Sequence, residues 1–217
     1  MKVKWLGHAC FLLTSDDGTR VITDPYKPGA FGLDYRPPAE TADIVTVSHE
    51  HDDHNNVADV KGNPKVVRGA GVHKVKGVEF KGVATSHDQA SGAQRGSNVV
   101  FCFTLDGVRV CHLGDLGHEL PDKTVSEIGP VDVLLVPVGG NFTIDAGAAN
   151  GVVDGIRPKI VIPMHFQNAR CPNFPVATVE GFQKLRQRVR ASNESEIEIK
   201  KDKLPEEAET VILKPAL

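Results

Sequence analysis

Residues 46–56 read TVSHEHDDHNN, and this stretch decides the fold. It continues the apolar run DIVTV, residues 43–47, which is short enough to be a buried strand. Nothing local pairs the polar side chains that follow, and solvated loops rarely contain so much imidazole. A bound metal ion would organise them. The crowded side chains are His49, Glu50, His51, Asp52, Asp53 and His54.

The spacing inside this stretch predicts two neighbouring sets of ligands. His49 and His51 stand at positions i and i+2 of an extended segment, so both imidazoles point to one side. Asp53 and His54 follow as the chain turns. Imidazole and carboxylate groups suit zinc and other first-row divalent ions. By the same spacing, Glu50 and Asp52 are interpreted as solvated spacers.

Four more polar residues follow apolar, strand-like runs further along the chain. They are Asp24 in VITDP, His87 in ATSHD, Asp115 in CHLGDLG and His165 in IVIPMHF. Together with the H-x-H-x-D-H run, their order and separations resemble the metallo-β-lactamase superfamily. The segment WLGHACF, followed by VITDP, is similar to one branch of it. That branch holds ascorbate-6-phosphate lactonase-like proteins, uncharacterised metal-dependent hydrolases and N-acylphosphatidylethanolamine phospholipase D.

The resemblance implies a dinuclear metal site and a role for each ligand. Zinc is the expected ion, with manganese, nickel and iron as alternatives. Asp24 is expected to brace the motif loop, and Asp115 to bridge the two ions. The implied ligands are His49, His51 and His87 for one ion, and Asp53, His54 and His165 for the second.

The resemblance also implies the fold, a four-layer αββα sandwich formed by one domain over residues 1–217. The sequence itself predicts strands in a first half rich in hairpins, and alternating strands and helices in the second half. A helix is expected from near Thr143, and the strongest amphipathic helix over residues 175–191. Two short strands, EIEIKK and ETVILK, are expected to close the chain.

The remaining candidate site residues are open to more than one interpretation. His8, Arg95 and Asn141 are candidates for substrate binding, although His8 could equally serve structural hydrogen bonds and Arg95 could be a solvated loop charge. The candidate catalytic residues are Asp53, as a metal ligand, and His118, as a proton donor to the leaving group.

Three further positions also remain open. Thr143 either contacts substrate or caps the following helix. His112 either shares a face with Asp115 or lies in the core. His73 is expected to be an exposed hairpin residue.

Composition bears on the cellular compartment of the protein and on the partners that it is expected to bind. Hydrophobic residues make up 40% of the 217, charged residues 24%, and the net charge is −3. Nothing in this balance predicts nucleic acid or membrane binding, and no signal peptide or membrane span is found. Four cysteines without CxxC spacing indicate a reducing cytoplasm. A homo-oligomer is compatible with the sequence.

The function expected from these observations is hydrolysis of a small anionic ester by a metal-bridging hydroxide. Phosphodiesters come first, and lactones of phosphorylated sugars second. A ribonuclease of the same fold is the alternative enzyme, although KLRQRVR, residues 184–190, is the only basic helix face expected. A non-enzymatic metal-binding scaffold is the third hypothesis. Glyoxalase II-type, flavodiiron-type and β-lactamase activities lack the domains, ligands or export signal that they need.

Overall fold

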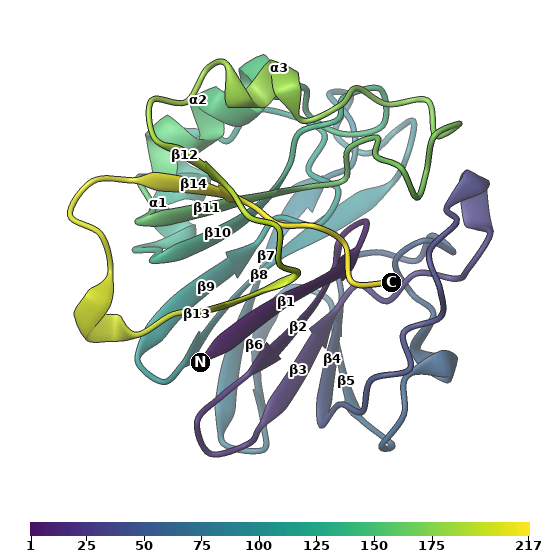
Figure 1. The fold of residues 1–217 in the computed structure, drawn as a ribbon, viewed down its shortest axis with the longest axis vertical. Coiled ribbons are helices and arrows are strands. Elements are labelled where there is room, and N and C mark those ends of the chain that lie inside the picture. The colour runs from purple at the N-terminus through teal and green to yellow at the C-terminus, as the bar shows by residue number, and fades with distance from the viewer.

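The computed structural model describes residues 1–217, and two β-sheets packed face to face form its centre (Figure 1). The smaller sheet has six strands in the order β13-β1-β2-β3-β4-β5. Their bounds are β1 Lys2–Gly7, β2 Cys10–Thr14, β3 Arg20–Thr23, β4 Ile44–Val47, β5 Lys65–Arg68 and β13 Glu196–Glu198.

The larger sheet has eight strands in the order β12-β14-β11-β10-β9-β8-β7-β6. Strands β6, β7, β8 and β9 pair with their neighbours in antiparallel fashion. Strands β9, β10, β11, β14 and β12 pair in parallel. Their bounds are β6 Gly71–Val75, β7 Val78–Ser86, β8 Ser97–Leu105, β9 Val108–His112, β10 Val133–Pro137, β11 Ile160–Met164, β12 Val189–Ala191 and β14 Glu209–Ile212.

Helices cover the outer face of the larger sheet (Figure 1). The α-helices are α1 Asp122–Ile128, α2 Ala146–Ile156 and α3 Glu180–Gln183. Three 3₁₀ turns complete the elements, η1 Ala30–Gly32, η2 Val57–Asp59 and η3 Lys201–Lys203. No helix has the length and apolar character that a bilayer crossing requires.

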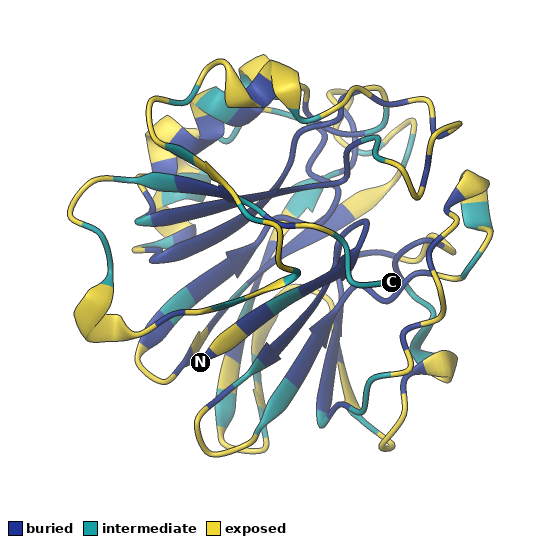
Figure 2. Ribbon diagram, viewed as in Figure 1, coloured by how far each residue is buried: buried dark blue, intermediate teal, exposed yellow.

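The burial pattern explains why β10 and β11 are apolar throughout. Every residue of both strands is buried, because the helices cover one face and the smaller sheet covers the other (Figure 2). In β2 the side chains alternate instead. Phe11 and Leu13 belong to the core between the sheets, whereas Leu12 belongs to a second cluster on the outer face of the smaller sheet.

The predicted αββα sandwich is confirmed, although its two outer layers are unequal. On the outer face of the smaller sheet, the covering residues include Tyr26, Leu33 and Tyr35 from the long segment between β3 and β4. That segment contains η1 and no α-helix. The outer layer on this side is therefore built mainly from loop side chains.

The helix predicted over residues 175–191 is wrong. Only α3, of four residues, forms there, and the chain then extends into β12. Phe182 is buried as the helical pattern requires, but Leu185 is 49% exposed. Val189 pairs with Thr210 of β14 instead of completing a helical face. Strand pairing at the sheet edge outweighs the local helical pattern, so the predicted basic helix face at 184–190 does not exist.

Two smaller differences concern the other helices. The helix expected from Thr143 begins at Ala146, because Asp145 is its N-cap and accepts a hydrogen bond from the Ala148 N–H at 2.9 Å. Thr143 therefore does not cap it. Helix α1 was not predicted, since DKTVSEI buries only Ile128 and so shows little apolar periodicity.

Candidate metal centre

The predicted metal-binding side chains come together at one edge of the sandwich. Strands β7, β9, β10 and β11 run in the same direction, and β3 and β4 are parallel to each other. Because parallel strands end at a common edge, residues that follow them in sequence become neighbours in space. Asp24 follows β3, His49 to His54 follow β4, His87 follows β7, Asp115 follows β9 and His165 follows β11.

Two groups of ligands lie within this cluster. The imidazoles of His49, His51 and His87 have nitrogen atoms within 4.8 Å of one another. A second group within the same limit contains His8, Asp53, His54 and His165. His51 is exposed to solvent, whereas the other residues of both groups are buried.

Asp115 lies between the two groups. Its Oδ2 atom is 3.2 Å from His87 Nε2 of the first group and 3.1 Å from His54 Nε2 of the second. His165 Nε2 is 3.3 Å away and His49 Nε2 is 3.9 Å away. Ligand atoms about 2.0–2.2 Å from one ion stand roughly 3–3.5 Å apart, so most of these separations suit shared coordination.

The hydrogen-bond pattern provides a direct test of whether a metal fits. Buried polar atoms in proteins nearly always have partners. Eight buried side-chain atoms here have none, and six of them belong to the cluster. They are His49 Nε2, Asp53 Oδ1, His87 Nδ1, Asp115 Oδ1 and both ring nitrogens of His165. Divalent ions are the partners that such a set of nitrogen and oxygen atoms fits.

Electrostatics support the same conclusion. Burial would raise the pKa of Asp115, but the imidazoles of His165 and His54 hold that pKa well below its usual range. Burial, followed by repulsion from nearby imidazoles, lowers the pKa of His49 to about 3. The carboxylate is thus ionised and the imidazole neutral at pH 7, which are the forms that bind metals.

Asp24 fixes the motif loop from beneath. Its Oδ1 accepts the Ser48 N–H at 2.8 Å, and its Oδ2 lies 3.0 Å from His54 Nδ1. His54 thus has Asp24 at Nδ1 and Asp115 at Nε2, and although burial would lower the pKa of His54, these carboxylates and Asp53 raise it well above its usual value. Asp24 itself has a φ of 37°, a strained value held by these contacts.

Asn98 holds the loop that carries Asp115, and sequence reasoning missed it. Its Oδ1 accepts the Asp115 N–H at 2.9 Å, and its amide donates to the Leu113 carbonyl at 2.9 Å. Gly114, with a φ of 55°, passes so close that a Cβ there would lie 2.4 Å from Asn98 Oδ1. A buried asparagine at the start of the apolar run NVVFCF was the available signal.

His8 and His112 receive definite positions. His8 Nε2 is 3.1 Å from Asp53 Oδ2 and 3.2 Å from His54 Nε2, so this residue joins the second ligand group. Burial lowers the pKa of His8 to about 4. His112 lies in the core, with Nε2 2.9 Å from the Ala9 carbonyl and Nδ1 accepting the Gly114 N–H at 3.2 Å. It supports the loop and does not face the ligands.

Three other candidates do not reach the cluster. His118 Nε2 accepts the Ser86 N–H at 3.2 Å, and His118 Nδ1 lies 2.7 Å from the Glu119 carbonyl, so both ring nitrogens contact backbone groups. The Asn141 amide donates to the Pro175 carbonyl at 2.9 Å. Thr143 bonds the carbonyl of its neighbour Ile144.

A pocket of about 230 Å³ opens directly onto the ligands. Arg95 lines it, as the substrate-binding hypothesis requires, and Asp88 fixes the loop that carries this arginine. The Asp88 carboxylate accepts four backbone N–H groups, from Ala90, Gly92, Gln94 and Arg95. Burial alone would raise the pKa of Asp88, but these donors outweigh it and lower the pKa to about 2. The full lining is Phe31, His51, Asp53, His87, Arg95, Asp115, Phe142, His165 and Phe174.

Glu50 and Asp52 lie outside the cluster. Glu50 forms an ion pair with Arg68, and Asp52 lies 3.7 Å from Lys27 Nζ, both on the surface. His73 is half-buried, with Nε2 3.0 Å from the Gly69 carbonyl. The three phenylalanines in the pocket were not predicted, since they lie outside the strands and α-helices and show no periodicity.

Comparison with known proteins identifies a family and several relatives that this chain resembles. The family described as the beta-lactamase superfamily domain matches residues 2–165, from the start of β1 to His165. A protein of Carboxydothermus hydrogenoformans, described as a UPF0173 metal-dependent hydrolase, is 33% identical over 193 residues. The matched part covers 76% of this chain and 84% of that protein.

Two further proteins cover more of the chain. A UPF0173 protein of Pyrococcus abyssi is 33% identical over 208 residues, which cover 88% of this chain and 92% of that protein. A crystal structure of a proposed Zn-dependent hydrolase of the metallo-beta-lactamase superfamily, from Thermotoga maritima, is 40% identical with a TM-score of 0.80. That match covers 98% of this chain and 97% of the other.

Proposed function

The chain belongs to the beta-lactamase superfamily, and from this premise we propose that it is a hydrolase that uses two divalent metal ions to cleave a small anionic ester. Zinc is the first choice of ion, because imidazole and carboxylate ligands at these separations suit it. Manganese, nickel and iron accept the same ligands. Phosphodiesters are the first substrate class and lactones of phosphorylated sugars the second.

The position of Asp115 carries the proposal. One buried carboxylate stands within 3.1–3.3 Å of imidazole nitrogens from three different segments, and its other oxygen has no partner. A residue that only stabilised the fold would have its hydrogen bonds satisfied. A carboxylate shared between two ions accounts for both observations.

The chain's own residues prepare the site for this chemistry. When bound, two divalent ions supply a hydroxide at neutral pH and offset the negative charge that develops on the ester. Asp24 orients His54, Asn98 orients the Asp115 backbone, and His8 contacts Asp53. These contacts fix the ligand atoms in advance, which lowers the cost of reaching the productive geometry.

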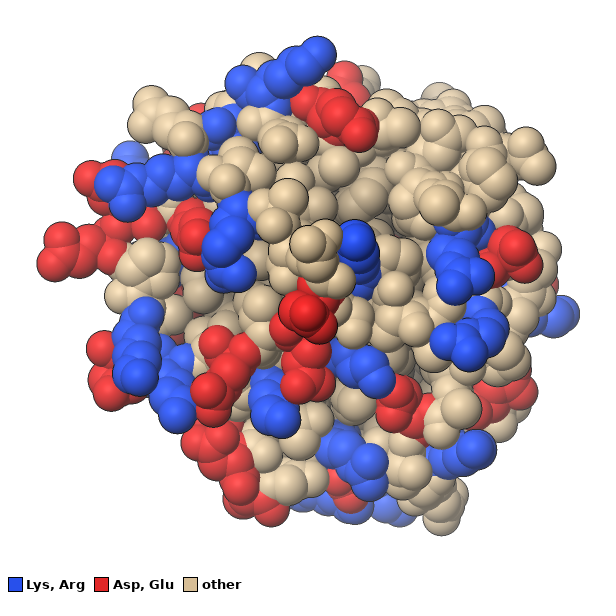
Figure 3. Space-filling model, viewed as in Figure 1, with Lys and Arg blue, Asp and Glu red and all other residues tan.

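The charge of the pocket favours an anionic substrate. Two divalent ions bring more positive charge than the carboxylates of Asp53 and Asp115 remove, and Arg95 adds a cation to the lining. Elsewhere the surface is mixed: Figure 3 shows basic and acidic side chains interspersed over the face in view. We therefore propose a compact anionic group bound at the metals, in preference to a long polyanion gripped by the surface.

Elemental analysis of the purified protein, followed by a hydrolysis screen, tests the proposal. We expect up to two divalent ions per chain and cleavage of bis(p-nitrophenyl) phosphate or of a lactone of a phosphorylated sugar. Asp53→Asn should lower mainly one of the two metal occupancies. Faster cleavage of structured RNA than of any small ester would favour the ribonuclease alternative instead.

A further inference from the structure

Three phenylalanines line the pocket, and we name Phe31, Phe142 and Phe174 together the aromatic wall. They come from three separate segments, η1, the β10–α2 connection and the loop after β11. The rings of Phe142 and Phe174 are 5.6 Å apart, and Phe174 lies 5.4 Å from the ring of the ligand His165. The aromatic wall thus continues directly from the metal ligands.

Phe31 combines an exposed side chain with an unfavourable backbone conformation. Its side chain is 63% exposed, and it is the only aromatic residue among the large exposed hydrophobic residues. Its backbone has φ 50° and ψ 21°, the left-handed region, which is unfavourable for a bulky residue. An exposed ring on a strained backbone at a pocket is evidence for a binding role.

Arg95 places a positive charge beside this apolar surface. Its guanidinium carbon is 5.7 Å from the centre of the Phe142 ring, and it is the only lysine or arginine in the lining. The four hydrogen bonds to Asp88 hold its loop. A ligand that meets the metals and Arg95 with an anionic group therefore has an aromatic surface next to it.

We propose that this pocket selects esters in which an aromatic ring lies next to the anionic phosphoryl or carboxyl group, with the ring packed against the aromatic wall. This inference rests on the proposed function and narrows its substrate class. Phe31 and Phe142 are the specificity-determining residues. A flat ring suits the site because offset aromatic contacts add to the burial of apolar area.

Calorimetric titration of the metal-loaded protein with two phosphonates tests the proposal without relying on turnover. Phenylphosphonate and methylphosphonate carry the same anionic group and differ only in the ring. We expect phenylphosphonate to bind at least ~10-fold more tightly. Phe31→Ala should reduce this preference to a few-fold while leaving methylphosphonate binding and metal content unchanged. Leu185→Ala, at an exposed residue outside the pocket, should change neither affinity.

The outcomes separate this inference from the proposed function. Equal binding of the two phosphonates, with esters still hydrolysed, would overturn the aromatic selection and leave the hydrolase proposal standing. A Phe31→Ala variant that weakens both ligands equally would also overturn it, because the ring would then not be what Phe31 recognises. Failure of both phosphonates to bind, with no ester cleaved, would overturn both proposals.

Discussion

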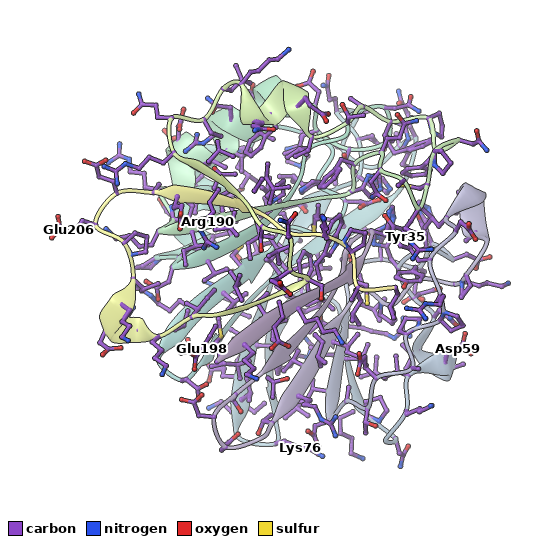
Figure 4. All side chains as sticks on the ribbon, in the orientation of Figure 1. Tyr35, Asp59, Lys76, Arg190, Glu198 and Glu206 are labelled. Atoms are coloured by element: carbon purple, nitrogen blue, oxygen red, sulfur yellow. The ribbon has the colours of Figure 1, made fainter.

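Two buried aspartates lie at opposite ends of the same parallel strands and have opposite surroundings. Asp132 directly precedes β10, and Asp115 follows β9. Figure 4 labels Glu206 at the left of the view and Tyr35 at the right, on opposite sides of the molecule. Asp132 accepts hydrogen bonds from Arg109 and Lys201 on both of its oxygens. Asp115 has one oxygen without any partner.

This difference in hydrogen bonding distinguishes an aspartate that stabilises the fold from one that belongs to the candidate site. Both aspartates are 2% exposed, and neighbouring cationic or imidazole groups lower both pKa values despite burial. The cations beside Asp132 are the side chains of Arg109 and Lys201, so this carboxylate stabilises the fold without a bound ligand. Asp115 has only imidazoles beside it, and in the proposed function bound metal ions supply its cations. A buried carboxylate left incompletely paired therefore marks the functional end of the sandwich.

The largest effect should come from Asp115→Asn. This change removes the only carboxylate that both ligand groups share, so metal affinity should fall at least ~100-fold at both positions and hydrolysis should be lost. Elemental analysis and the ester assay measure the two effects. Asp132→Asn is the matched control and should keep its metal. Full metal occupancy after Asp115→Asn would show that Asp115 is not a shared metal ligand and does not differ from Asp132 in this way.

Removing the metals should lower the free energy of unfolding through the Asp115 end of the sandwich and should not affect the contacts of Asp132. Ions held at 100 times their dissociation constant contribute about 2.7 kcal/mol each to the free energy of unfolding. Chelation should remove that contribution in the wild type and, by the same amount, in Asp132→Asn. Denaturant titration before and after chelation measures it. No loss of stability on chelation would show that the cluster binds ions weakly.

Asp132→Asn should lower the free energy of unfolding by about 2 kcal/mol, because charged hydrogen bonds to a buried carboxylate are lost. Arg109 and Lys201 are 43% and 47% exposed, which keeps the loss below that of a fully buried pair. The pKa of Asp132 is depressed in the folded state, since its bonds to Arg109 and Lys201 outweigh burial.

The depressed pKa predicts a definite pH dependence. The contribution of Asp132 should be complete above about pH 4, the unfolded value, and should disappear as the pH falls toward the folded pKa. Denaturant titrations at several pH values should therefore show a smaller gap between wild type and Asp132→Asn in acid. A gap independent of pH would mean that this carboxylate is not the titrating group.

His8→Asn should have an intermediate effect at the other end. His8 Nε2 lies 3.1 Å from Asp53 Oδ2, and loss of this contact should weaken one metal position about 10-fold. Competitive chelator titration resolves the two affinities. Weakening of both positions to the same degree would show that His8 acts on the whole loop and not on Asp53.

The smallest effect is expected from His118→Ala. Both ring nitrogens of His118 contact backbone groups, so we expect less than about a threefold change in kcat for esters with either good or poor leaving groups. A much larger loss with poor leaving groups would identify His118 as the proton donor after all.

Prediction from sequence succeeded where polar residues follow apolar strands. The ends of β4, β9 and β11 could be located from their apolar runs, so the arrival of His49, Asp115 and His165 at one edge was foreseeable. It failed over residues 175–191, where an apolar spacing of helical period belongs to a short turn and an edge strand. Edge pairing with β14 is a non-local contact that no local pattern reveals.

The sequence by itself determined the chemistry of the site and the location of most strands, because residue type, spacing and apolar runs are local properties. Only the tertiary structure decided which polar groups remain without partners. Asp24, Asp88, Asp115 and Asp132 share one residue type, yet in the fold three have partners on both carboxylate oxygens and Asp115 does not. The aromatic wall was decided in the same way, since its three rings come from distant segments that meet only in the folded chain.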